Sequence, residues 1–147
     1  MQLQKASRKK VKIKMSLASP TGFGKTISAL LIAYGITDDW SKIAVIDTEN
    51  ESASLYAKHK LSNGFLIGEF QTIPLSPPFE PEKYTKAIKM CEEDGSIEVI
   101  IIDSITHVWQ GQGGLLEYNT FLGGNIFLNW AKTTPCYRQA ILYRLLH

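Results

Sequence analysis

The sequence predicts an α/β fold in which a mainly parallel sheet is flanked by helices. Short apolar segments of strand type alternate with segments of helical periodicity along most of the chain, which is the pattern of βαβ units. Two of the apolar segments end in an acidic residue, and a turn rich in glycine joins the first strand to the first helix. Because ligands bind beyond the carboxyl ends of strands in open parallel sheets, this turn and these acids mark the expected site.

The first half of the chain contributes two of the predicted strands. Val11–Leu17 alternates apolar and polar side chains, which is typical of a strand. Beyond the turn, Thr26–Gly35 has apolar residues at helical spacing, and Lys42–Asp47 is an apolar run of the buried-strand type. The weaker expectations are a short helix over Ser52–Lys60 and an extended edge segment over Phe65–Thr72.

The second half begins with a proline-rich loop at Pro74–Pro81. Pro81 suits the first position of a helix, since its missing N–H has no intrahelical partner there. We expect that helix to run through about Cys91, with Tyr84, Ala87, Ile88 and Cys91 on one face, and Gly95 to close the turn after it. Glu98–Asp103 holds four β-branched apolar residues and predicts the strongest strand. The remaining expectations are a loop at Gly111–Gly114, helices over Leu115–Phe121 and Ile126–Lys132, and a last helix from Thr134-Pro135 through about Leu146.

Composition restricts the class of protein. With 147 residues, 44% hydrophobic and 20% charged, the chain can form one domain with a real core, which argues against wholesale disorder. Its apolar runs are too short to cross a bilayer, so we expect no membrane partner. Cys91 and Cys136 lack metal-ligand spacing and imply no disulfide framework, which favours a cytoplasmic location.

Basic residues are concentrated at the N-terminus. Residues 1–14 hold six Lys or Arg side chains and no acid, whereas the remainder holds ten against fourteen acids. A basic arm over residues 1–10 is compatible with contact to nucleic acid phosphates, here single-stranded DNA. The alternative is a solvated lead-in to the first strand, and the sequence leaves both interpretations open.

The glycine-rich turn matches a phosphate-binding loop of the Walker A type. The pattern requires Gly-Lys-Ser/Thr between a strand and a helix, and Gly24-Lys25-Thr26 supplies it. Backbone N–H groups and the positive helix N-terminus would surround a nucleotide phosphate. Lys25 would neutralise the β and γ oxygens, and the Thr26 hydroxyl would bind Mg²⁺. The predicted ATP-binding residues are Ser19, Pro20, Thr21, Gly22, Phe23, Gly24, Lys25, Thr26 and Ile27.

One position departs from the loop pattern. Ser19 stands where the first glycine is usual, so we expect its side chain to crowd the turn or impose a poorer backbone angle, with weaker binding. The alternative interpretation of the whole segment is a glycine-rich turn that happens to precede a lysine.

Two strand-end acids complete the candidate site. Asp103 ends a buried-type strand and is placed to hold Mg²⁺ through water and to hydrogen-bond Thr26. Glu49 follows the other buried strand and could orient and deprotonate an attacking water. Asp47 is the rival for that role, and the alternatives are an Asp103 that caps a turn and a Glu49 that is simply a solvated loop acid.

Taken in order, these elements resemble the RecA-like P-loop ATPases, and more narrowly the ATP-binding proteins of tailed phages and prophages described as AAA-type or RecA-like. The similarity extends over nearly the whole chain. It includes the hydrolytic glutamate in Asp47-Thr48-Glu49, the Walker B segment Ile102-Asp103-Ser104, the stretch Thr106-His107-Val108-Trp109 and the glycines Gly113-Gly114.

The resemblance implies functions that the residues alone do not. It implies ATP hydrolysis for complete relatives, in phage DNA recombination or replication within the bacterial host cytoplasm, and we also expect homo-oligomers. It also implies a further strand, bearing a polar sensor, between the phosphate-loop strand and the Walker B strand. Tyr137–His147 fits the family poorly, so we expect residues 1–147 to form a single, incomplete P-loop NTPase domain that lacks C-terminal strands. The alternatives are a catalytically inactive, truncated nucleotide-binding remnant and, less favoured, a P-loop kinase of small molecules.

Overall fold

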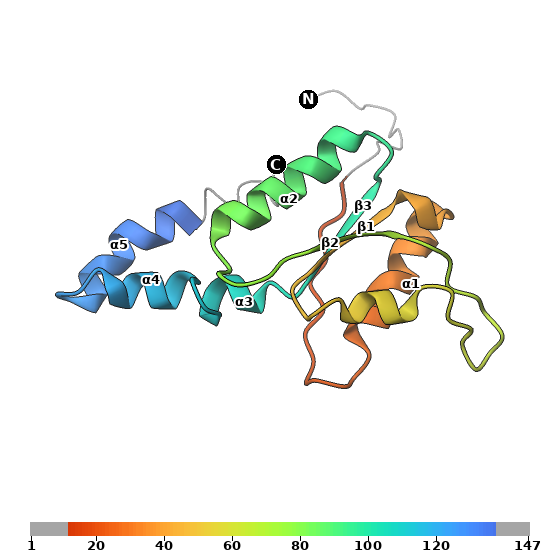
Figure 1. The fold of residues 1–147 in the computed structure, drawn as a ribbon, viewed down its shortest axis with the longest axis horizontal. Coiled ribbons are helices and arrows are strands. Elements are labelled where there is room, and N and C mark those ends of the chain that lie inside the picture. The colour runs from red at the N-terminus through yellow and green to blue at the C-terminus, as the bar shows by residue number, and fades with distance from the viewer. Residues whose placement is uncertain (1–11, 138–147) are drawn as a thin grey trace, which may run out of the picture.

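The computed structural model describes residues 12–137, and its centre is a sheet of three parallel strands. The strand order is β2 (Gln71–Pro74), β1 (Ile43–Asp47) and β3 (Val99–Asp103), as seen in Figure 1. The pairing of β1 with β3 is in register from their first residues to their last, so their terminal aspartates lie side by side. The predicted α/β class with a parallel, helix-flanked sheet is confirmed.

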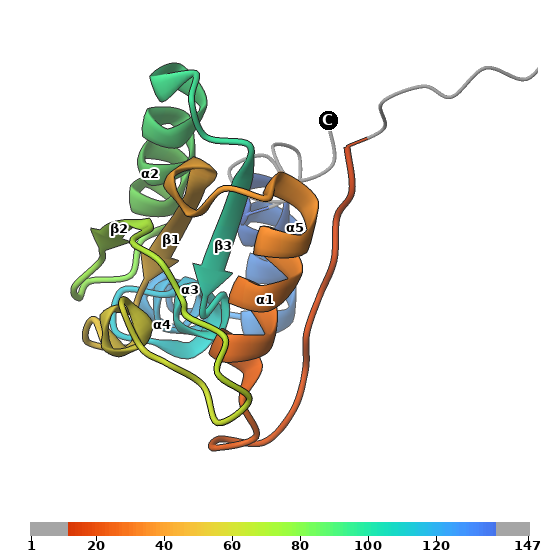
Figure 2. The ribbon, with the colours of Figure 1, turned by 90° about the vertical axis from the view of Figure 1, so that its right-hand side faces the viewer.

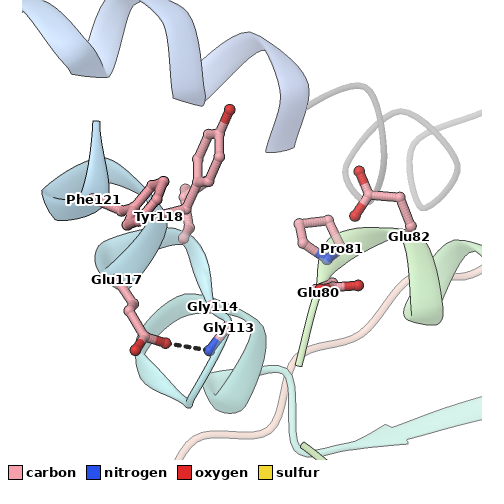
Figure 3. A pocket seen from close by; sticks show the side chains of 9 residues that line it. Glu80, Pro81, Glu82, Gly113, Gly114, Glu117, Tyr118 and Phe121 are labelled. Carbon is pink, nitrogen blue, oxygen red and sulfur yellow. Dashed lines mark hydrogen bonds between the residues drawn. The ribbon is translucent and has the colours of Figure 1, made fainter. Parts of the chain in front are cut away.

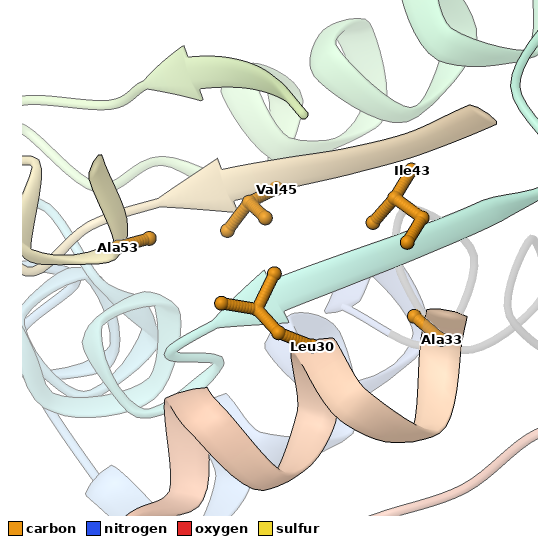
Figure 4. Packing of buried hydrophobic residues seen from close by; sticks show 5 residues of the cluster. All are labelled: Leu30, Ala33, Ile43, Val45 and Ala53. Atoms are coloured by element: carbon orange, nitrogen blue, oxygen red, sulfur yellow. The ribbon is translucent and has the colours of Figure 1, made fainter. Parts of the chain in front are cut away.

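Helices cover both faces of this sheet. Helix α1 (Lys25–Thr37) lies on one side and α2 (Pro81–Asp94) on the other (Figure 2). Side chains alternate along β1, so that Ile43 and Val45 pack with Leu30 of α1 (Figure 4). Ile46 points the other way and packs with the α2 side of the core. The central strand is therefore buried from both faces.

The chain beyond β3 forms a helical extension. Helices α3 (Thr106–Gln110), α4 (Leu115–Phe121) and α5 (Ile126–Tyr137) extend away from the sheet (Figure 1). Two short 3₁₀ helices, η1 (Trp40–Lys42) and η2 (Ser52–Tyr56), flank β1. None of the helices in residues 12–137 is long and apolar enough to cross a membrane.

The predicted strand at Val11–Leu17 is wrong for the part that the structure describes. Lys12 through Leu17 has no strand assignment, and the side chains of Ile13 and Met15 are 69% and 61% exposed. Figure 2 shows the segment running past α1 rather than within the sheet. An alternating sequence becomes a strand only beside a neighbour that completes its hydrogen bonds, and within residues 12–137 none lies beside it.

The C-terminal helices also differ from expectation. The sequence predicts that one helix ends near Lys132 and another begins at Thr134-Pro135, but α5 continues through Pro135 to Tyr137. Trp109 of α3 explains the continuity, because it stacks on Trp130 and meets Tyr137 edge-on. Those partners are two helical turns apart on one face of α5. The rest of the predicted last helix lies outside the described residues.

Smaller differences concern boundaries. Helix α1 continues past Gly35 to Thr37, the short helix after β1 is a 3₁₀ helix, and the edge strand β2 begins at Gln71 instead of Phe65. The expectations for α2 are confirmed: Pro81 starts it and Gly95 ends it at φ 69°. Its buried residues are the predicted Tyr84, Ala87, Ile88 and Cys91.

Candidate nucleotide-binding site

The glycine-rich loop adopts a backbone that only glycine adopts easily. Gly22 has φ 84° and Gly24 has φ 75°, both in the left-handed region. Gly24 is the residue before α1, and its carbonyl accepts the first helical hydrogen bond from Ser28 N at 3.0 Å. The loop therefore leads directly into the N-terminus of a 13-residue helix, where free N–H groups and the helix dipole favour an anion.

Lys25 folds back over this loop. Its Nζ donates to the carbonyl oxygens of Ser19 and Pro20 at 2.9 and 3.0 Å. The ammonium is thus held at the loop by two neutral, exposed acceptors. A phosphate oxygen would be a stronger acceptor because it is charged, so an anion can displace these carbonyls.

Ser19 causes no backbone strain. Its φ lies outside the left-handed region, its side chain is exposed, and its Oγ contacts the Pro20 carbonyl at 3.3 Å. The expectation that the missing glycine imposes a poorer backbone angle or crowds the turn is wrong, since the chain passes this position in a conformation open to any residue.

Thr26 and Asp103 meet at the start of α1. Thr26 Oγ1 donates to Asp103 Oδ2 at 2.5 Å, so the predicted contact between the loop and the end of β3 is present. Mg²⁺ prefers oxygen ligands, and a hydroxyl oxygen and a carboxylate oxygen are both of this kind. The pair therefore fits a Mg²⁺ site that phosphate oxygens and water would complete. Residues 12–137 contain no group of three or more His, Cys, Asp or Glu side chains suited to a metal. A phosphate-bound Mg²⁺ needs no such group.

Asp47 has a structural role in the turn after β1. Only 2% of the residue is exposed, Oδ1 accepts from Glu49 N at 2.6 Å, and Oδ2 accepts from Ala53 N at 2.8 Å. Both carboxylate oxygens are therefore committed to backbone N–H groups. This removes Asp47 as the rival of Glu49 for contact with a water molecule.

Glu49 follows β1, and its side chain contacts residues that follow β3. Its Oε1 accepts a hydrogen bond from Ser104 Oγ at 3.0 Å and lies 3.7 Å from His107 Nδ1. The side chain is 45% exposed, so Glu49 is accessible to solvent, in contrast to the buried Asp47. The structure thus gives Glu49 defined partners beside the strand that carries Asp103.

Sequence reasoning gave no role to the hydroxyl residues that hold this arrangement. Thr48 is buried, and its Oγ1 accepts from Ser104 N at 2.8 Å and lies 2.8 Å from His107 Nδ1. A signal for it exists in the sequence: β1 and β3 both end in an aspartate followed by a hydroxyl residue. Parallel pairing in register brings Thr48 beside the backbone of Ser104.

Tyr84 contributes from α2. Its hydroxyl reaches the Ser104 carbonyl at 3.5 Å, and burial raises its pKa to about 12 because the phenolate would lose solvation. The group is therefore a neutral donor beneath the end of β3 at physiological pH.

Other aromatic residues and a cavity lie away from the loop. Trp109 stacks on Trp130, and Trp40 packs against Tyr34, as expected for structural aromatics. A cavity of about 450 Å³ lies between the start of α2 and α4, as seen in Figure 3. Its lining includes no residue of the glycine-rich loop. Its lining consists of Glu80, Pro81, Glu82, Gly113, Gly114, Leu115, Glu117, Tyr118 and Phe121.

Comparison with protein-family models, with curated proteins and with solved structures gives no match for this chain.

Proposed function

We propose that this protein is a RecA-like P-loop protein that binds ATP with Mg²⁺ and hydrolyses it. The observation that carries the proposal is the hydrogen bond between Thr26 Oγ1 and Asp103 Oδ2. It joins the first helical turn after a glycine-rich loop to an acid at the end of a parallel strand. A chance turn before a lysine would not require this long-range contact.

The loop would bind the nucleotide through its backbone. The left-handed Gly22 and Gly24 leave room for phosphate oxygens to approach the main chain, and the N-terminus of α1 adds its partial positive charge. Lys25 would exchange the Ser19 and Pro20 carbonyls for β and γ oxygens. Thr26 and Asp103 would hold Mg²⁺, which supplies neutralisation of phosphate charge when bound.

Glu49 is the proposed general base. It would orient a water molecule and accept its proton as the water oxygen bonds to the γ-phosphorus and the bond to the bridging oxygen of ADP breaks. The engagement of Glu49 Oε1 with Ser104 supports a fixed carboxylate position. Asp47 cannot serve, because both of its oxygens accept buried backbone hydrogen bonds.

Nucleotide binding without turnover is the second candidate. The hydrogen bond from Ser104 to Glu49 favours this candidate, because it already occupies one of the two carboxylate oxygens of Glu49. Transfer to a small-molecule acceptor is the least supported alternative, and a product that requires an added acceptor would identify it.

A role in phage DNA recombination or replication is a further part of the proposal, and it depends on the sequence resemblance. Of the six basic residues within residues 1–14, the structure describes Lys12 and Lys14, and both are exposed. Affinity for single-stranded DNA that falls steeply with salt, and falls again in a Lys12→Ala/Lys14→Ala variant, would support it.

The decisive experiment for ATP binding compares two lysine variants by calorimetric titration with Mg-ATP. Lys25→Ala removes charge-assisted hydrogen bonds to phosphate and should weaken binding about 10- to 100-fold. Lys89→Ala, in an exposed ion pair with Glu93 on α2, is the matched control and should bind normally. Unchanged binding by Lys25→Ala would refute the proposal.

Turnover is tested with a matched pair of glutamate variants. Glu49→Gln should retain Mg-ATP binding and lose hydrolysis by about 100-fold or more, because the proton acceptor is gone. Glu69→Gln, which changes an exposed ion pair with Lys58, should hydrolyse ATP at the normal rate. If wild-type protein binds ATP and releases no phosphate, the second candidate is correct.

A further inference from the structure

The hydroxyl and imidazole groups around Glu49 form a connected polar group that the proposed function does not yet use. We infer that Ser104 and His107 are positioning residues for Glu49, with His107 presenting a protonated Nδ1 to Thr48 and to the Glu49 carboxylate. The inference rests on the proposed function for its catalytic consequence, but the arrangement itself can be tested without activity.

The position of Ser104 is fixed by the pairing of the strand ends. Thr48 N donates to the Asp103 carbonyl at 2.8 Å, and Ser104 N donates back to Thr48 Oγ1 at 2.8 Å. The first bond continues the backbone pairing beyond Asp47 and Asp103, and the second joins the Ser104 backbone to the side chain of Thr48. Ser104 Oγ therefore reaches Glu49 Oε1 at 3.0 Å from a rigid base.

The hydrogen bonds at Thr48 allow two positions for the proton of His107. Thr48 Oγ1 carries one proton and accepts from Ser104 N, and its other neighbours are the Ser104 carbonyl at 3.1 Å, His107 Nδ1 at 2.8 Å and the Tyr84 hydroxyl. Either Thr48 donates to the carbonyl and accepts from Nδ1–H, or Thr48 donates to Nδ1 and Tyr84 donates to the carbonyl.

The charge of Glu49 distinguishes between these two arrangements. Its Oε1 lies 3.7 Å from His107 Nδ1. An N–H dipole facing a carboxylate is attracted, whereas a nitrogen lone pair in that place would be repelled. Of the two arrangements that the contacts at Thr48 allow, the electrostatics therefore favours the one with the proton on Nδ1.

Packing holds the imidazole ring in this orientation. The Phe79 ring stacks on His107 with centroids 4.7 Å apart and an interplanar angle of 23°. Phe79 is itself buried and fixed, since its N–H donates to the Gln112 carbonyl at 2.6 Å. Gly111 closes α3 by donating to the His107 carbonyl at 2.7 Å. A ring held on its face and at its backbone can direct Nδ1 with little freedom.

The consequence is a division of roles between the two oxygens of Glu49. Oε1 accepts from Ser104 and faces His107, while Oε2 receives no hydrogen bond from residues 12–137. Oε2 is thus the oxygen left to accept a proton from water. Loss of either anchor would let the carboxylate rotate, which lowers the rate of proton transfer without changing the phosphate loop.

The arrangement is tested first by ¹⁵N NMR of the histidine rings in the full chain at neutral pH. A His107→Asn sample assigns the signals among the three histidines. The expected result is the Nδ1–H tautomer for His107. Detection of the Nε2–H tautomer would overturn the inference, whether or not the protein hydrolyses ATP.

The catalytic consequence is tested by two amide variants. The amide of Asn can take the place of Nδ1–H, and the amide of Gln can take the place of Nε2–H. His107→Asn should therefore keep kcat within about threefold, whereas His107→Gln should lower kcat about 10- to 100-fold. KM for ATP should stay unchanged in both. Equal losses in the two variants would contradict a role for Nδ1.

Ser104 variants provide the second arm. Ser104→Ala should lower kcat and leave Mg-ATP affinity unchanged, and Ser104→Thr should restore the rate. If wild-type protein binds ATP without turnover, hydrolysis fails as a proposed function while the NMR result still decides the tautomer.

Discussion

The ends of β1 and β3 carry the same pattern, an aspartate followed by a hydroxyl residue, yet the two aspartates differ in role. Asp47 and Asp103 are paired in register and lie side by side. Asp47 is buried and binds two backbone N–H groups of its own turn. Asp103 is half-buried and reaches across to Thr26 of α1. One carboxylate stabilises the fold, and the other is available to a site.

The chain that follows each strand explains the difference. After Asp47 a short turn leads into η2, and the N–H groups of Glu49 in the turn and Ala53 in η2 both donate to the carboxylate. After Asp103 it leads into α3, and no such turn closes over the side chain. The role of an acid at the end of a strand therefore depends on which groups its oxygens contact. The sequence of the strand does not specify those groups.

The largest expected effect is on folding. Asp47→Ala leaves two N–H groups without an acceptor in a buried turn, so the free energy of unfolding should fall by about 2–4 kcal/mol. Asp103→Ala should cost under about 1 kcal/mol, since its carboxylate has one hydroxyl partner and is less buried. Urea unfolding measures both. Equal losses would break the comparison.

The next effect is on ligand affinity. Asp103→Asn should weaken Mg-ATP binding about 10- to 100-fold and remove most of its dependence on Mg²⁺, because a charged oxygen donor is lost. The control is Asp38→Asn, an exposed residue with φ 52°, a backbone that asparagine also adopts. Titration with and without EDTA measures the change, and undiminished Mg²⁺ dependence would show that Asp103 is not at the cation site.

A smaller effect is expected with alkaline pH at Tyr84, beneath the end of β3. Its pKa is raised to about 12 from an ordinary value of 10.0, so the unfolded chain loses this proton before the folded chain. The free energy of unfolding should be unaffected below pH 10 and fall by up to about 2 kcal/mol as pH rises to 12.

Tyr84→Phe should reduce this slope in pH-dependent unfolding. It should not abolish it, because burial also raises the pKa of Cys91 and Tyr137, which act with the same sign. An unchanged slope in Tyr84→Phe would show that Tyr84 keeps an ordinary pKa in the folded protein.

The smallest effect is expected at the start of the phosphate loop. Ser19→Gly should change Mg-ATP affinity by less than about threefold, since Ser19 already has an unstrained backbone and glycine adds only freedom to the unbound loop. Calorimetric titration with Mg-ATP, with Asp103→Asn measured in parallel, gives the affinity of this variant. A gain of tenfold or more would mean that Ser19 limits binding after all.

A second contrast shows where local sequence is insufficient. The apolar runs of β1 and β3 look equally suited to burial, but every residue of β1 is buried and every residue of β3 is only half-buried. Strand β1 has a neighbour on each side, whereas β3 has one in the part of the chain that the structure describes. Neighbours, which depend on the whole fold, set the burial of a strand.

The sequence by itself determined the elements whose causes are local. Four β-branched residues predict β3, and Pro81 and Gly95 predict the limits of α2. It also placed Thr26 opposite Asp103, because parallel strands bring their carboxyl ends to one edge.

Only the tertiary structure decided what depends on distant partners. It left Lys12–Leu17 outside the sheet, carried α5 through Pro135, and separated Asp47 from Glu49 in role. It also brought Thr48 and His107 together, 59 residues apart in the chain. A hydrogen bond or a stacked ring requires both partners in place, so these features could not be predicted from either segment alone.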